Sequence, residues 1–101
     1  SIQSNLFSNL ICLEKLDLSQ NRLIHINSGV FFTLANLKTL NLGLNFINST
    51  GKLAFRSLKN LQTLILNNNV FRKIDNVMFS FLPELIHLEI INSQIETIDE
   101  H

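Results

Sequence analysis

The sequence predicts a solenoid of the α/β class, built from about four similar coils that stack side by side. The same pattern begins at leucines that are 24 residues apart, namely Leu13, Leu37, Leu61 and Leu85. The copies follow the template L-x-x-L-x-L-x-x-N-x-L, and a template repeated at a fixed period indicates identical structural units in a row. We therefore expect short parallel strands on a concave inner face and an irregular or 3-10 helical convex side.

The period also sets the expected domain organisation, which is a single solenoid over residues 1–101. The complete copies are 13–36, 37–60 and 61–84, with 1–12 as the tail of a preceding copy and 85–101 as a partial one. Because the pattern starts and stops out of step with the period, we expect the chain to be a fragment of a longer solenoid.

Apolar residues at fixed places in each copy predict the core. Residues two apart point to the same side of a strand, so Leu16 and Leu18 face inward and Asp17 between them faces solvent. All twelve apolar positions of the L-x-x-L-x-L segments are expected in the core. Two further columns should pack as a spine beneath the strands: Phe7, Phe31, Phe55 and Phe79, and Leu10, Leu34, Leu58 and Leu82.

A column of asparagines predicts a hydrogen-bonded ladder where each coil leaves its strand. Asn21, Asn45 and Asn69 occupy the same place in successive copies. A buried amide both donates and accepts, so each can satisfy backbone groups of its own coil and of the next. Ser93 takes this place in the last copy, where its hydroxyl should make a weaker rung.

Composition and charge exclude several functional classes. The formal net charge is zero, which leaves no electrostatic footprint for nucleic acid. No apolar run approaches the roughly 20 residues that span a bilayer, so direct membrane insertion is not expected. Four residues that could bind a metal lie at unrelated places in the repeat: Cys12, His25, His87 and His101. Neither catalysis nor a metal or cofactor is therefore expected.

The full period, L-x-x-L-x-L-x-x-N-x-L-x-x-I-x-x-x-x-F-x-x-L-x-x, resembles the typical class of leucine-rich repeats over residues 1–98. This class is characteristic of animal extracellular proteins: Toll and Toll-like receptors, adhesion and axon-guidance receptors, small proteoglycans and jawless-fish lymphocyte receptors. The resemblance implies a secreted or cell-surface protein, such as the ectodomain of a membrane receptor. The cysteine-rich caps that usually close such solenoids are missing from this chain.

Two other positions depart from the family pattern. Thr50 replaces an apolar residue, so we expect the segment 49–52 to be loosely packed or bent. Cys12 is interpreted as a small side chain between coils, because one cysteine cannot form an internal disulfide. Pairing of Cys12 with another chain is the alternative.

One short motif points to a modification. Asn48-Ser49-Thr50 matches the N-glycosylation acceptor and lies just after the asparagine turn of the second copy. Such triplets also arise by chance in asparagine-rich chains, so a plain surface loop is the alternative. Together with the extracellular class, the motif makes Asn48 the candidate glycosylation site.

Outward-facing positions of the strand segments carry the candidate partner-binding residues. Four apolar side chains stand where polar ones would be tolerated, although strand propensity alone can explain such residues: Leu44, Ile65, Ile86 and Ile91. The predicted partner-binding residues are Leu44, Phe46, Ile65, Asn68, Val70, His87, Glu89 and Ile91.

Two functions follow from these observations. The first is a segment of an extracellular receptor ectodomain that binds a protein, or a glycan- or lipid-bearing ligand, through its concave or flanking surface. For such a receptor we expect Toll-like innate-immune recognition and pairing into receptor homo- or heterodimers. The alternative is a structural or adhesion protein in which the repeats act as a spacer.

Overall fold

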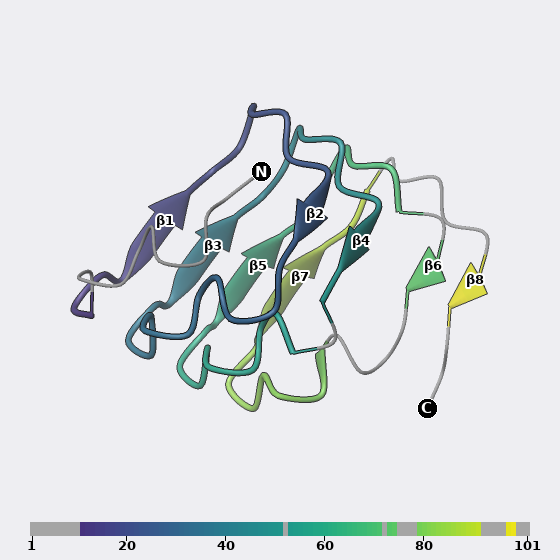
Figure 1. Ribbon diagram of the computed structural model, residues 1–101. Coiled ribbons are helices and arrows are strands. Elements are labelled where there is room, and N and C mark those ends of the chain that lie inside the picture. Colours follow the sequence, from purple (N-terminus) through teal and green to yellow (C-terminus); the bar gives the residue numbers. More distant parts are fainter. Residues whose placement is uncertain (1–10, 52, 72, 75–78, 92–96, 99–101) are drawn as a thin grey trace.

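The computed structural model describes residues 11–51, 53–71, 73–74, 79–91 and 97–98. The chain winds through successive coils, and each coil adds one strand to a four-stranded parallel sheet with the order β1-β3-β5-β7 (Figure 1). These strands are β1 (Lys15–Asp17), β3 (Thr39–Asn41), β5 (Thr63–Ile65) and β7 (His87–Glu89). The arrangement confirms the predicted solenoid of short parallel strands.

A second set of short strands lies on the returning side of the coils. β2 (His25–Ile26) pairs in parallel with β4 (Ser49–Thr50), and β6 (Lys73–Ile74) pairs in parallel with β8 (Thr97–Ile98). The chain passes through each of them after it leaves the main sheet and turns (Figure 1). The returning side was expected to be irregular or 3-10 helical, so these paired strands are regular structure that the sequence did not predict.

Strand pairing in the main sheet joins residues that are 24 positions apart. Leu40 pairs with Leu16 on one side and with Leu64 on the other. Backbone hydrogen bonds continue past the strand ends, for example from the Leu42 N–H to the Ile65 carbonyl oxygen at 2.8 Å. Because the offset equals the repeat period, each side chain lies beside its counterpart in the neighbouring coil.

The leucine columns form the core, but they are not equally buried. Leu40 and Leu64 in the central strands have no exposed surface, and burial of such a side chain contributes about 1.5–3 kcal/mol. Leu16 in β1 is half-buried, and Leu88 in β7 is 39% exposed. Within the described part of the chain, β1 and β7 are the edge strands, each with a neighbouring strand on one side. The prediction of a core position is therefore wrong for Leu88.

The predicted phenylalanine spine lies beneath the sheet. The rings of Phe31 and Phe55 stack with their centroids 6.4 Å apart and their planes 8° apart, and both side chains are buried. Phe79 is half-buried, whereas Phe7 and Leu10 lie outside the described residues. The adjoining leucine column is buried at Leu34, Leu58 and Leu82.

Asn45 and Asn69 form the predicted ladder, and both are buried. The Nδ2 group of Asn45 donates to the carbonyl oxygens of Leu42 in its own coil and Leu18 in the preceding coil, at 3.0 Å each. Its Oδ1 atom accepts from the Leu23 N–H at 3.2 Å. Asn69 bonds in the same way one coil further on. The bridge thus runs to the preceding coil, not to the next one as expected.

Asn21 departs from this ladder because its side chain is exposed. Its Nδ2 group donates to the carbonyl oxygens of Leu18 and Ser19, which belong to its own coil. β1 is an edge strand, so in the described structure Asn21 has no earlier coil to bridge. The prediction of a buried amide is wrong for Asn21, and Ser93 lies outside the described residues.

A second asparagine column links the coils at the turn before each strand. Asn36 Nδ2 donates to the Ile11 carbonyl oxygen, and Asn60 Nδ2 donates to the Ala35 carbonyl oxygen, both at 2.9 Å. Cys12 holds this place in the first described coil, and its free thiol is exposed. Cys12 is thus exposed at a position whose counterparts Asn36 and Asn60 link neighbouring coils, and its role between coils stays a prediction.

The segment that follows Asn48 is closely packed at Gly51. Ser49 and Thr50 form β4, and the Gly51 N–H donates to the Ile26 carbonyl oxygen at 2.7 Å. A Cβ atom on Gly51 would lie 2.5 Å from the backbone nitrogen of Ser28, so a larger residue would collide with the neighbouring coil. The expectation of loose packing is wrong at Gly51, whereas Ser49 is exposed and Thr50 is only half-buried, and residue 52 lies outside the described residues.

Candidate functional site

The concave face of the main sheet carries rows of outward-facing side chains. They come from the first and third residues of each strand, which lie in register between neighbours: Lys15, Thr39, Thr63 and His87 in one row, and Asp17, Asn41, Ile65 and Glu89 in the other. A third row follows the strand ends at Ser19, Gly43, Asn67 and Ile91. The rows change from small polar residues over β3 to ionisable and apolar residues over β7.

Over β1 and β3 the polar groups of this face bond to their own coil. The Asp17 carboxylate accepts a hydrogen bond from the Ser19 hydroxyl at 2.5 Å and from the Ser19 N–H at 2.9 Å. These two bonds, led by the hydroxyl, lower the pKa of Asp17 because they stabilise its ionised form. Asn41 Oδ1 likewise accepts from the Gly43 N–H at 2.9 Å. These polar groups are already satisfied within the protein.

Over β5 and β7 the polar groups bond both within β7 and across coils. His87 Nε2 lies 2.5 Å from Glu89 Oε2, and Asn67 Nδ2 donates to Glu89 Oε1 at 2.6 Å. Asn67 Oδ1 in turn accepts from the backbone N–H of Ile91 at 2.7 Å. His87 first, and then Asn67, lower the pKa of Glu89, because their hydrogen bonds outweigh the effect of partial burial. The Glu89 carboxylate is therefore ionised at neutral pH and fixed in orientation.

Apolar side chains flank this network. Ile65 pairs in register with Glu89, and Ile91 is 59% exposed. We name these residues the C-terminal concave site: Ile65, Asn67, His87, Glu89 and Ile91. The site places a fixed carboxylate beside exposed apolar surface. A partner could cover this apolar surface while the hydrogen bonds of the carboxylate stay intact.

The structure separates the remaining partner-binding candidates from this site. Leu44 and Asn68 lie at the turn after the strands, where they adopt positive φ angles of 56° and 61°. Phe46 and Val70 follow the turn, and Phe46 is 55% exposed while Val70 is half-buried. The predicted residues thus form two groups, one on the concave face and one along the edge where the coils leave the sheet.

Asn67 belongs to the site, although it was not among the predicted partner-binding residues. Asp17 and Asn41 each accept a hydrogen bond from the N–H two residues later, and Ile65 has no side-chain acceptor for such a bond. The change from polar Asp17 and Asn41 to apolar Ile65 at the same place in the repeat was the feature of the sequence that could have indicated Asn67. It leaves the Asn67 amide to bond with Glu89 in the next coil.

Asn48 lies on the surface, as its motif predicted. Its side chain is exposed, and its backbone N–H donates to the Ile24 carbonyl oxygen of the preceding coil at 3.0 Å. In the following residue, the Ser49 hydroxyl lies 2.7 Å from His25 Nδ1. The backbone at Asn48 is therefore held between coils while its amide faces solvent.

The described residues contain no group of three or more His, Cys, Asp or Glu side chains that could hold a metal ion. Within the same ranges, no helix has the length and apolar character needed to cross a membrane.

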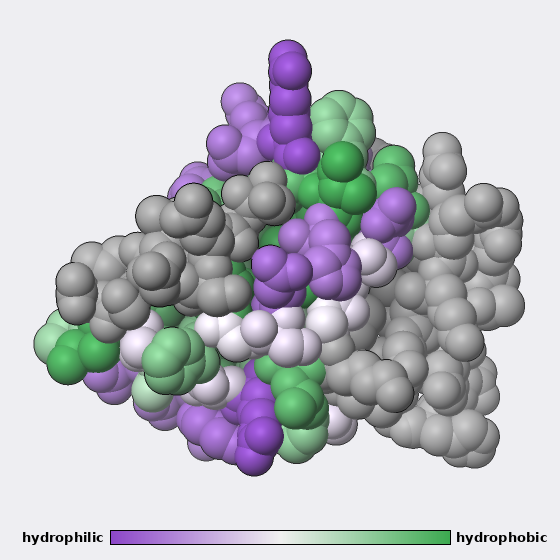
Figure 2. Space-filling model, in the orientation of Figure 1, coloured by the Kyte–Doolittle hydropathy of each residue, from purple (hydrophilic) through white to green (hydrophobic). Residues whose placement is uncertain are grey.

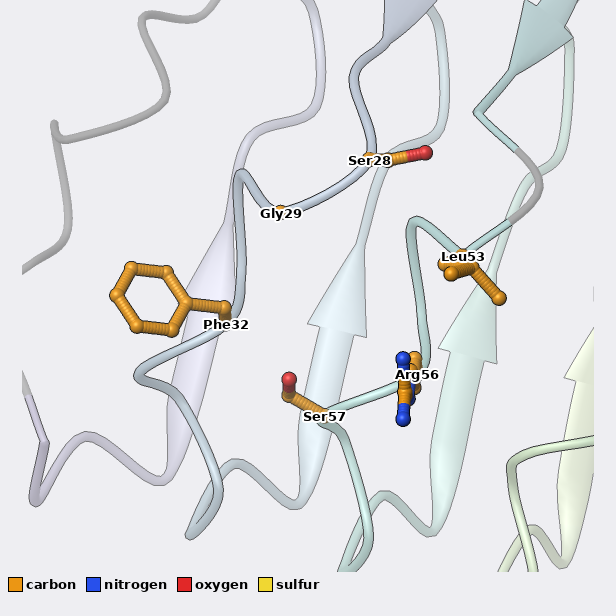
Figure 3. A pocket seen from close by; sticks show the side chains of 6 residues that line it. All are labelled: Ser28, Gly29, Phe32, Leu53, Arg56 and Ser57. Atoms are coloured by element: carbon orange, nitrogen blue, oxygen red, sulfur yellow. The ribbon is translucent and has the colours of Figure 1, made fainter.

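An open hollow of about 340 Å³ lies on the outer side of the coils (Figure 3). It is lined by Ser28, Gly29, Phe32, Leu53, Arg56 and Ser57. The Phe32 ring points away from Arg56 and Ser57, so these three side chains do not converge on one position (Figure 3). Figure 2 shows polar and apolar residues interspersed over the described part of the face in view. The concave face therefore offers the more organised site.

Comparison with protein families gives one match. The family model described as Leucine rich repeat matches residues 1–45 and 12–71, so the matches together span residues 1–71. This span includes the coils of β1, β3 and β5, and β7 lies beyond it. A comparison with curated proteins found no match.

Proposed function

Because the chain belongs to the leucine-rich repeat family, whose members are typically non-enzymatic protein-interaction modules, we propose that it binds a protein ligand through the C-terminal concave site. We place this interaction in an extracellular receptor ectodomain, with Toll-like innate-immune recognition as the nearest model. Binding at the concave face would leave the flanks of the solenoid free for receptor pairing.

One observation carries the proposal, namely the fixed Glu89 carboxylate beside an exposed isoleucine. His87 and Asn67 hold Glu89, and Ile91 is 59% exposed next to them. A group that is already oriented loses little freedom when a partner arrives, so association is less costly in entropy. The matching partner surface is a basic side chain beside an apolar one.

Photo-crosslinking tests this surface with a matched control. Ile91 and Ile11 are both 59% exposed, but Ile11 lies in the turn before β1. We expect cells that display the full-length protein with Ile91→p-benzoylphenylalanine to yield a crosslink to a discrete extracellular protein. The Ile11→p-benzoylphenylalanine variant should yield none. Equal crosslinking at both positions, or crosslinking at position 11 alone, would contradict the proposal.

The charge of the site has its own control. Glu89→Lys is expected to weaken capture of that partner at least about tenfold, equivalent to about 1.4 kcal/mol. Glu14→Lys changes a carboxylate whose side chain is 64% exposed and lies 3.6 Å from Lys38, outside the C-terminal concave site. That variant should bind like the wild type. Similar losses for both variants would indicate a general effect of net charge.

A structural or adhesion role, with these coils as a spacer, is the second candidate. The first coils favour it, because the polar groups of Asp17 and Asn41 are bonded within their own coils. Unlike the C-terminal concave site, the outward-facing rows of these coils hold no large apolar side chain, so a partner would bury little apolar surface there. If the spacer role is correct, the probe at position 91 will form no crosslink, and contacts will come from the ends or sides of the solenoid.

The extracellular location is tested separately. An epitope tag on the full-length protein should be reached by antibody on unpermeabilised cells, or should be recovered from the medium. Staining that requires permeabilisation, with no secreted protein, would overturn the proposed location.

A further inference from the structure

Phe46 and Asn48 lie on the same side of the chain where it turns away from the main sheet. Phe46 is 55% exposed, Ile47 between them has no exposed surface, and Asn48 is exposed. Residues two apart in an extended segment point the same way, so the Phe46 ring and the Asn48 amide project from one surface. Hydrogen bonds from their N–H groups to the preceding coil, to Leu23 at 2.9 Å and Ile24 at 3.0 Å, fix this segment.

A second exposed apolar side chain lies beside Asn48. Ile24 holds the same place in the preceding coil and is 57% exposed. Neighbouring coils pair at the spacing of a β-sheet, roughly 4.8 Å. Asn48 therefore has Phe46 on one side within its coil and Ile24 on another side in the preceding coil. Large apolar side chains that are exposed together often mark a surface that another molecule or group covers.

The Asn48 side chain itself is available for attachment. It makes no hydrogen bond to any of the described residues, and the Thr50 needed by the acceptor motif follows it in β4. The motif is therefore displayed at the surface, while the backbone on both sides is held by the coil.

We propose that Asn48 carries an N-linked glycan whose first N-acetylglucosamine packs across the Phe46 ring and against Ile24. This inference rests on the extracellular location in the proposed function. Attachment joins C1 of the sugar to Asn48 Nδ2, releases one amide proton and expels the lipid pyrophosphate of an activated oligosaccharide donor. One face of the pyranose ring is lined with C–H groups, which are attracted to the negative face of an aromatic ring.

The inference gives Phe46 a different role from the one predicted by sequence. A ring covered by sugar is withdrawn from protein contact, so Phe46 would stabilise the glycosylated coil instead of anchoring a partner. Partner binding would then be confined to the concave face, on which Asn48 does not lie.

The test is a double-mutant comparison of glycosylated protein. The chain is produced in a secretory eukaryotic host, occupancy at Asn48 is measured by mass spectrometry, and the glycan is trimmed enzymatically to one N-acetylglucosamine. Tm is then compared with Asn48→Gln in wild-type, Phe46→Ala and Phe32→Ala backgrounds. Phe32 is the matched control, because it is 60% exposed and lines the outer hollow.

We expect the sugar to raise Tm by roughly 3–6 °C in the wild type and in Phe32→Ala, and by less than about 1 °C in Phe46→Ala. Sugar proton resonances should move upfield in the ring current of Phe46 and return in Phe46→Leu, which keeps the apolar bulk. An unoccupied Asn48, or an equal gain in Tm without Phe46, overturns the inference. If Asn48 is glycosylated but the gain in Tm does not depend on Phe46, the proposed extracellular location is still supported. Crosslinking at position 91 tests protein binding independently of glycosylation and of this gain in Tm.

Discussion

Asn45 Oδ1 accepts a hydrogen bond at 3.1 Å from the backbone N–H of Asn21, the residue one period earlier in the chain. The two asparagines share a column but have different roles. The Asn45 side chain is buried and bridges two coils, whereas the Asn21 side chain is exposed and, among the described residues, bonds within its own coil. We therefore expect the buried, bridging amide to contribute more to stability than the exposed one.

Replacing these asparagines should have unequal effects. Asn45→Ala is expected to lower the free energy of unfolding by about 2–4 kcal/mol, because each buried backbone group left unpaired costs about 1–3 kcal/mol. Asn21→Ala should lower it by less than about 1 kcal/mol, because water replaces the lost bonds. Urea denaturation followed by circular dichroism measures both. Equal losses would show that burial does not decide the strength of the ladder.

The positive φ angles predict opposite effects for an exchange of residues. Leu44 and Asn68 have φ values of 56° and 61°, a region that costs a leucine about 1–2 kcal/mol and that asparagine tolerates better. We expect Leu44→Asn to raise the free energy of unfolding by about 0.5–1 kcal/mol and Asn68→Leu to lower it by a similar amount. Thermal denaturation is the measurement. A change in the same direction for both variants would exclude backbone strain as the cause.

Neighbouring phenylalanines give a matched pair for the core. Phe31 has no exposed surface and stacks on Phe55, whereas Phe32 is 60% exposed. Phe31→Ala is expected to cost about 3–5 kcal/mol, because it removes buried area and leaves a cavity. Phe32→Ala should change stability by no more than about 0.5 kcal/mol. Chemical denaturation compares them, and a small loss for Phe31→Ala would contradict the stacked spine.

The titration of Glu89 should depend on His87. The pKa of Glu89 is lowered in the folded state, so its contribution to stability is present above the unfolded pKa and is lost as pH falls through the lowered folded pKa. His87→Ala should raise the pKa of Glu89 toward its usual value, and Asn67→Ala should raise it less. Carboxyl carbon shifts in NMR titrations measure this. Asp17 is the control, because Ser19 lowers its pKa and His87→Ala should leave it unchanged.

The fold followed directly from the repeat. Strand positions, the central leucines and the Phe31–Phe55 stack were all predicted, because a column of identical side chains can only be buried together when coils stack in register. The predictions failed where coils differ in their surroundings, as at Leu88 in the edge strand β7 and at Asn21 after the opposite edge strand β1. The repeat pattern alone predicts the same degree of burial for every copy. In the stacked coils, burial differs between central and edge copies.

The candidate site was only partly predictable. His87, Glu89, Ile65 and Ile91 were selected because they occupy outward-facing places, which the strand alternation gives. Asn67 was missed, because its importance depends on a carboxylate that lies 22 residues later in the chain. The close approach of Gly51 to Ser28 was also unpredicted, since it depends on the distance between coils and not on either segment alone.

The sequence by itself determined the 24-residue period, the side chains that share each column and the side of the strand that each one faces. The tertiary structure alone decided which members of a column are buried, and which side chains meet across columns, as Asn67 meets Glu89. The physical reason is that alternation and period are local properties of the backbone. Burial and contacts between unlike columns depend instead on how many coils flank a residue and how closely they approach.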